Sequence, residues 1–169
     1  MKSILRAIPL LLAAAAATSC HQLNDERLPV MNVSINLDNP GIWDAYGVHY
    51  YGQFNNFILA TGIRLPAGFP YNSLSATGYG GVLLIYGQNA FTGDVGPLAY
   101  DLSCPVERQP DVRVYVNADF EAVCPECGSH YNVTEAGGSP TSDPAKAMNY
   151  AMTHYQCYPS VNGGYVIVR

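Results

Sequence analysis

The strongest constraint on the fold is a series of short apolar segments, each ended by a cluster of Gly, Pro, Asn or Asp residues. Residues 33–37 alternate apolar and polar side chains, which is typical of a strand with one buried face, and residues 38–41 end that strand. The best helical candidate, 145–151, is only about two turns long. The pattern predicts an all-β domain over residues 29–169, with further strands at 56–60, 81–87, 98–102, 112–117, 120–124, 129–133, 148–157 and 164–169.

Two short polar segments predict hairpin turns within this series. Asn117-Ala118-Asp119 separates two of the expected strands, and Asn162-Gly163-Gly164 separates another two. The second segment is the stronger signal, because Asn-Gly supplies the positive φ angles that tight hairpins need. We therefore expect antiparallel pairing on both sides of each turn.

The first 20 residues have the layout of an export signal. Lys2 and Arg6 form a basic head, an apolar run covers 7–17, and small residues precede Cys20. The apolar run is shorter than the roughly 20 residues that a membrane-spanning helix requires. The segment resembles the lipobox of bacterial lipoproteins, in which the cysteine carries diacylglycerol and begins the mature protein.

This resemblance implies a cleaved signal peptide over 1–19, a lipid on Cys20 and a lipid-anchored tether over 20–28. It places the protein in the bacterial cell envelope, membrane-anchored on the periplasmic or outer-membrane face. An ordinary signal peptide followed by an unmodified cysteine is the alternative. Removal of residues 1–19 would leave a chain long enough for one well-buried core.

The charge balance of the mature chain restricts its partners. Two of the eight basic residues, Lys2 and Arg6, belong to the signal, so six remain against 13 acidic residues. Lys146 is then the only lysine. An acidic surface repels phosphate backbones, which argues against nucleic acid as a partner.

Four cysteines follow Cys20, and three of them lie in one informative segment. In an exported protein, thiols form disulfides unless a metal binds them.

The segment 99–131 resembles the cluster-binding part of Rieske domains. That family holds a 2Fe-2S iron–sulfur cluster between two hairpin loops. The first loop has the pattern Cys-x-His and the second has Cys-x-x-His. The second loop often reads Cys-Pro-x-His-Gly-Ser-x-Phe/Tyr. The residues in register are Cys104, Cys124, Pro125, Gly128, Ser129 and Tyr131.

The resemblance extends over roughly residues 28–169, and Gly137-Gly138-Ser139-Pro140 occupies the place of the Pro-rich loop that covers the cluster. It implies stacked antiparallel sheets with two facing hairpin loops. It also implies electron transfer to a redox partner protein through an exposed cluster edge, which is a carrier's role and not that of an enzyme. No catalytic residue is expected, since no nucleophile triad, carboxylate pair or phosphate loop is readable.

Both histidine positions of the Rieske pattern are altered. Val106 stands at the first and Cys127 at the second. Valine cannot bind a metal, and the two imidazoles are what raise the potential of a Rieske cluster. A surviving 2Fe-2S cluster would use Cys104, Cys124 and Cys127. The candidates for its fourth ligand are Glu107, His130 and Cys157.

Two other outcomes are open for the same cysteines. Zinc accepts three thiolates and a histidine, and Cys124-x-x-Cys127-Gly128 has the form of a metal-binding knuckle. Without metal, the proximity of Cys104 and Cys124 would suit a disulfide between the loops. Each outcome requires Cys104 to lie beside Cys124 or Cys127.

The functions expected from the sequence follow from these outcomes. The first is an envelope lipoprotein with an electron-transfer or redox-associated role. The second is a cluster-free binding or assembly lipoprotein that uses the fold as a disulfide-stapled scaffold. The third is a zinc-stabilised structural module. Cys157 is expected to be structural, and the aromatic residues around Trp43 are expected to fill the β core.

Overall fold

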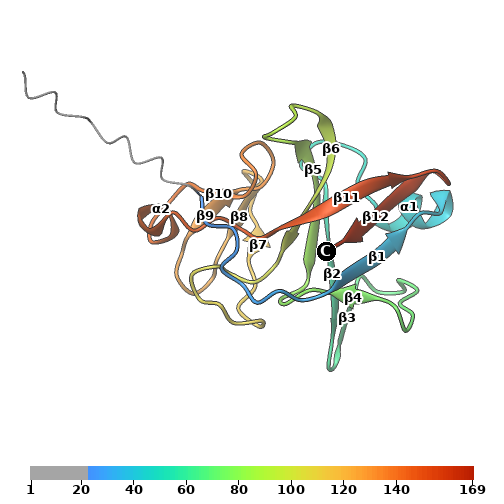
Figure 1. Ribbon diagram of the computed structural model, residues 1–169, viewed down its shortest axis with the longest axis horizontal. Helices are drawn as coiled ribbons and strands as arrows, with labels where there is room; N and C mark the ends of the chain where they lie inside the picture. Colours follow the sequence, from blue (N-terminus) through green and yellow to red (C-terminus); the bar gives the residue numbers. More distant parts are fainter. Residues whose placement is uncertain (1–22) are drawn as a thin grey trace, which may run out of the picture.

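The computed structural model describes residues 23–169, so the predicted signal peptide and Cys20 lie outside the described residues. Within residues 23–169, no helix is long and apolar enough to cross a membrane. The chain forms two antiparallel sheets with two short helices (Figure 1), which confirms the all-β class.

The larger sheet has eight strands and curls on itself. At one edge β4 pairs with β1, and the Leu59 N–H of β2 donates to Thr77 Oγ1 of β4 at 3.1 Å, which draws the two sides of the sheet together. In sheet order the strands are β3 (Ile63–Leu65), β2 (Phe54–Ala60), β5 (Val82–Gln88), β6 (Val95–Asp101), β11 (His154–Ser160), β12 (Gly164–Val168), β1 (Val33–Leu37) and β4 (Ala76–Thr77).

The smaller sheet has four short strands and packs against one face of the larger sheet. Its strands β8 (Glu121–Val123) and β9 (His130–Asn132) lie at its centre, and the loop between them contains two of the site cysteines. The outer strands are β7 (Tyr115–Val116) and β10 (Ser139–Pro140).

Strands β5 and β6 separate two hydrophobic cores. In β5, Val82 and Leu84 face the core inside the curled sheet, whereas Leu83 and Ile85 face the core between the two sheets. All four side chains are fully buried. Such a continuous apolar run is typical of a strand covered on both faces. The second core contains Cys104 and Cys124, so the site cysteines are part of the packing that joins the two sheets.

The sequence placed most strands correctly but missed several short elements. The turns at 117–119 and 162–164 connect β7 to β8 and β11 to β12, as predicted. The short strands β3, β4 and β10 were not predicted. Neither was α1 (Pro40–Tyr46), where Asn39 caps the helix by accepting from the Gly41 N–H at 2.9 Å and Pro40 occupies the first turn.

The strand predicted at 148–157 is wrong in its first half. Helix α2 (Ala145–Met148) occupies the start of this region and ends at Asn149, whose φ of 57° is left-handed. Strand β11 begins only at His154. Residues 149–151 hydrogen bond instead with Asn24, a partner that no local pattern reveals.

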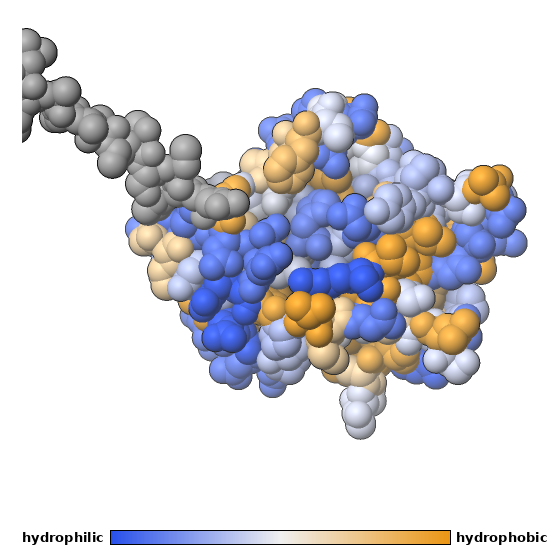
Figure 2. All heavy atoms as spheres, in the orientation of Figure 1, coloured by the Kyte–Doolittle hydropathy of each residue, from blue (hydrophilic) through white to orange (hydrophobic). Residues whose placement is uncertain are grey.

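The described chain begins beside α2, at one end of the longest axis, and α1 lies at the opposite end (Figure 1). Figure 2 shows hydrophilic residues around this starting point, whereas hydrophobic residues gather toward the other half of the visible face. Leu28 is buried, so the chain already packs into the domain at this residue.

A fully buried carboxylate, Asp101, fixes the start of the first cysteine loop. Its oxygens accept hydrogen bonds from the N–H groups of Tyr79 at 3.0 Å, Gly80 at 3.0 Å and Ser103 at 2.7 Å, and from the Tyr155 hydroxyl. Burial raises the pKa of this carboxyl, and the four donors oppose that rise. A Cβ on Gly80 would lie 2.5 Å from the Ser103 nitrogen, so only glycine fits there.

Replacement of Asp101 tests this arrangement. Asp101→Ala leaves several buried donors without an acceptor, so the free energy of unfolding should fall by about 3 kcal/mol. The exposed Asp94 provides a matched control, since Asp94→Ala should change it by less than about 0.5 kcal/mol. Urea denaturation of the three proteins measures both effects. Equal stability of the two variants would contradict the anchoring role of Asp101.

Candidate metal-binding thiol site

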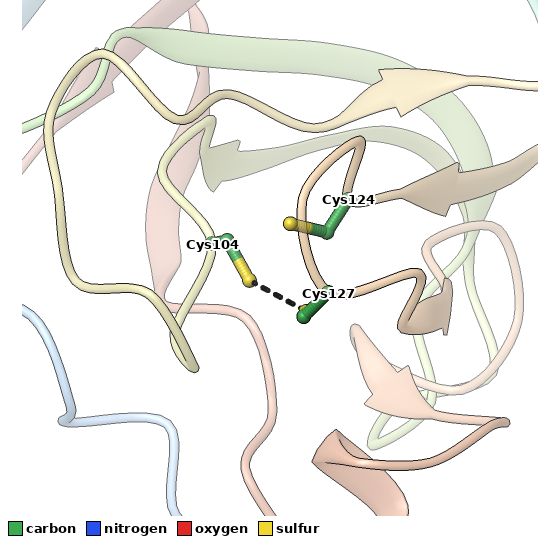
Figure 3. Close-up of side chains that lie close together, drawn as sticks. All are labelled: Cys104, Cys124 and Cys127. Atoms are coloured by element: carbon green, nitrogen blue, oxygen red, sulfur yellow. Dashed lines mark hydrogen bonds between the residues drawn. The ribbon is translucent and has the colours of Figure 1, made fainter.

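Two loops bring three cysteines together between the sheets. Cys104 begins the loop that follows β6, and Cys124 and Cys127 belong to the loop between β8 and β9. The Sγ atoms of the three residues all lie within 4.8 Å of one another, and those of Cys104 and Cys127 are 3.7 Å apart (Figure 3). The expected proximity of Cys104 to the second loop is confirmed.

The two loops have the same backbone construction. Each begins with Cys-Pro, and the N–H four residues later donates to the cysteine carbonyl, from Arg108 at 2.9 Å and from Gly128 at 3.1 Å. Both closing residues have left-handed φ angles, 55° for Arg108 and 69° for Gly128. Glycine adopts this conformation at no steric cost, whereas at Arg108 the loop accepts a disfavoured one. The repeated geometry presents Cys104 and Cys124 to each other from opposite sides.

This construction also directs backbone N–H groups at sulfur. The backbone N–H groups of Val106 and Glu107 act to lower the pKa of Cys104, and those of Glu126 and Cys127 act in the same way on the pKa of Cys124. Such donors stabilise a thiolate. Val106, which stands at the first histidine position of the Rieske pattern that the segment resembles, thus contributes its main chain, while its side chain packs against the core between the sheets.

Burial makes two of the thiols hard to ionise. Cys104 and Cys124 are 0% and 1% exposed, whereas Cys127 is half-buried. Burial raises the pKa of Cys124 to about 12 and also raises the pKa of Cys104, against the lowering effect of the amide donors. These two thiols are therefore protonated at neutral pH. A metal ion that binds here must displace their protons.

Two hydroxyl groups complete the surroundings of the sulfur atoms. The Tyr131 hydroxyl lies 3.5 Å from Cys104 Sγ, and the Cys127 thiol donates to Ser129 Oγ at 3.2 Å. Tyr131 is fully buried, and burial raises its pKa. In the sequence, Ser129 and Tyr131 were identified only because they match the Rieske pattern. Their side-chain contacts with sulfur were not predicted.

The other residues proposed as ligands lie apart from the three thiols. Among residues 23–169, neither Glu107 nor His130 belongs to the cluster of potential metal ligands. The His130 imidazole faces Glu121 instead, with 2.7 Å between Nδ1 and the carboxylate. Cys157 packs against the core inside the curled sheet, where burial raises its pKa to about 12.

Cys104, Cys124, Cys127 and Cys157 are all free thiols in the structure. The 3.7 Å between the Sγ atoms of Cys104 and Cys127 is well beyond the roughly 2.05 Å of a disulfide bond. The site therefore presents three thiols around one point. That arrangement can bind a thiophilic ion, and it can also be oxidised.

Comparisons with protein-family models, with curated proteins and with solved structures found no match to this chain.

The Glu121–His130 pair gives a prediction about pH. The hydrogen bond from His130 holds the pKa of the Glu121 carboxyl below its usual value, with a further contribution from Thr141 Oγ1 at 2.9 Å. A carboxyl with a lowered folded-state pKa stabilises the fold above its unfolded pKa, and this stabilisation is lost as pH falls. Glu121→Gln should therefore cost about 0.5 kcal/mol near pH 6, and the difference should shrink as pH falls below the ordinary glutamate pKa of about 4.3. Denaturation at several pH values measures it; a constant difference would contradict the pairing.

Proposed function

We propose that this protein is an envelope lipoprotein whose Cys104, Cys124 and Cys127 bind a single thiophilic metal ion. The supporting observation is the spacing of the sulfur atoms. A tetrahedral ion with Zn–S bonds of about 2.3 Å holds its sulfur ligands about 3.8 Å apart. The Cys104–Cys127 separation of 3.7 Å fits this value, and the upper limit of 4.8 Å for the whole set requires only small side-chain rotations.

A single ion fits the triad better than the two-iron cluster of the Rieske domains that the segment resembles. A two-iron cluster divides its ligands between two metals, so ligands on different irons stand farther apart than ligands on one ion. Here all three sulfur atoms converge on one point. With no fourth protein ligand in the group among the described residues, a water molecule or an external ligand would complete the coordination.

The identity of the ion decides the biochemical role. Thiolates favour iron, zinc and copper(I) over hard cations such as magnesium. An iron centre would be an electron carrier with a redox partner, as the Rieske resemblance implies. A zinc centre has no redox chemistry and would hold the two loops together as a structural module.

A second candidate function follows from the close approach of Cys104 and Cys127. An external disulfide could oxidise this pair by thiol–disulfide exchange, taking up the two electrons and two protons of the thiols as it is reduced to a dithiol. The new S–S bond would need only a modest movement, because the two sulfur atoms already lie 3.7 Å apart. In this case the domain is a metal-free scaffold for binding or assembly. A disulfide closing a loop of this length would stabilise the fold by about 3 kcal/mol. Labelling of thiols before and after reduction would detect it as two thiols that react only after reduction.

Metal analysis of protein purified without oxygen tests the main proposal. The wild type should carry one ion per chain and no acid-labile sulfide, because a cluster contains inorganic sulfide and a single ion does not. Cys104→Ser and Cys127→Ser should each lower the metal content several-fold, since each removes one of three thiolates. Iron in the metal analysis would indicate the electron carrier, and zinc would indicate the structural module.

Cys157→Ser is the matched control, because it removes a cysteine from the other core. Its metal content should equal that of the wild type. Far-UV circular dichroism should show that all three variants remain folded. Metal that is retained in both loop variants, or that amounts to two irons with sulfide, would contradict a single-ion site.

A further inference from the structure

The segment that follows the predicted lipid anchor is fixed to the domain by its main chain. The Asn24 N–H donates to the Asn149 carbonyl and the Asn24 carbonyl accepts from the Ala151 N–H, both at 3.0 Å. The Thr153 hydroxyl donates to the Asp25 carbonyl at 2.6 Å. Residues 24 and 25 therefore lie along the chain between α2 and β11, in the manner of an added strand.

The Arg27 side chain strengthens this docking. Its guanidinium lies over the Tyr150 ring, 4.0 Å from the ring centre, which is a cation–π arrangement. Leu28, next in the chain, is buried at 4% exposure. The segment 24–28 is thus held by backbone hydrogen bonds, a stacked cation and an apolar side chain.

Both thiol loops contact the elements that hold this segment. Arg108, which closes the first loop, donates from Nε to the Arg27 carbonyl at 3.1 Å. Ser129 Oγ, which accepts from the Cys127 thiol, also accepts from the N–H of Ala145, the first residue of α2. The docked segment and the thiol site therefore occupy the same end of the domain, opposite α1 (Figure 1).

The length of chain between the anchor and this docking point is short. Three residues separate Cys20 from Asn24, so an extended chain spans at most about 14 Å between their Cα atoms. A domain of this size has a radius of gyration of about 15 Å, and its full length is more than twice that radius. The reach of the tether is therefore much less than the length of the domain. A lipid on Cys20 would therefore hold α2 close to the membrane and leave α1 remote from it.

We propose that the lipid on Cys20 holds the thiol-bearing end of the domain at the membrane surface. The surface at this end is mixed: Lys146, Leu23 (42%) and Met148 (39%) are exposed, and so are Asp25, Glu26 and Asp143. The short tether, and not the surface charge, therefore sets the orientation. The inference rests on the lipoprotein part of the proposed function and not on metal binding. A redox partner or metal donor would reach the site close to the bilayer.

Energy transfer from tryptophan to a lipid-bound acceptor tests this orientation. Trp43, in α1, is the only tryptophan and reports on the remote end. A Trp43→Phe, Met148→Trp variant moves the donor to α2. Both mature lipidated proteins are incorporated into phosphatidylcholine–phosphatidylglycerol vesicles that contain dansyl-phosphatidylethanolamine. Transfer should be several-fold more efficient from position 148 than from position 43.

Two control variants separate the failure of the anchor from the failure of the orientation. Cys20→Ala should abolish transfer from both donors, and absence of transfer in the unaltered proteins would overturn the lipid anchor itself. Arg27→Ala combined with Thr153→Val should undock the segment and reduce the difference between the donors, while circular dichroism remains native. Membrane-bound protein with equal transfer from both positions, or stronger transfer from Trp43, would overturn the orientation and leave the anchor intact.

Discussion

The burial of the β5–β6 hairpin on both faces is the constraint on which the rest of the structure depends. Leu83 and Ile85 lie on the outer face of the curled sheet, on the side opposite to its internal core. Because both side chains are apolar, a second layer must cover them. Four short strands supply that layer, and with ten strand residues between them they have little apolar surface of their own. The first cysteine loop and the loop that carries Cys124 fill the remaining space. The thiol site is thus located in the seam that joins the two layers.

The backbone, more than the side chains, determines how the sulfur atoms meet. Asp101 holds the chain immediately before Cys104, and the matching turns closed by Arg108 and Gly128 set the direction of each loop. Two buried thiols are then placed close together although burial disfavours their ionised forms. The fold maintains this arrangement by its main-chain hydrogen bonds, which do not depend on whether sulfur is protonated.

The sequence predicted the fold class, most of the strands and the meeting of Cys104 with the second loop. These features depend on local alternation, on turn residues such as Asn162-Gly163 and on a spaced motif, all of which are visible in one chain. It did not predict α1, because Asn39 and Pro40 serve equally well to end a strand or to begin a helix. It also misassigned residues 148–153, whose conformation depends on distant pairing with Asn24. Side-chain directions in the site, such as that of His130 toward Glu121, depend on tertiary packing in the same way.

The unequal exposure of the three thiols has a kinetic consequence. Cys104 and Cys124 are buried, so an incoming ion or oxidant would contact the half-buried Cys127 first. Exchange at the site would then proceed through Cys127, with the two inner thiols engaged in later steps. Cys127 would thereby control access to the two buried thiols. If the site binds a metal ion or is oxidised, the accessibility of Cys127 would limit the rate at which the two buried thiols react.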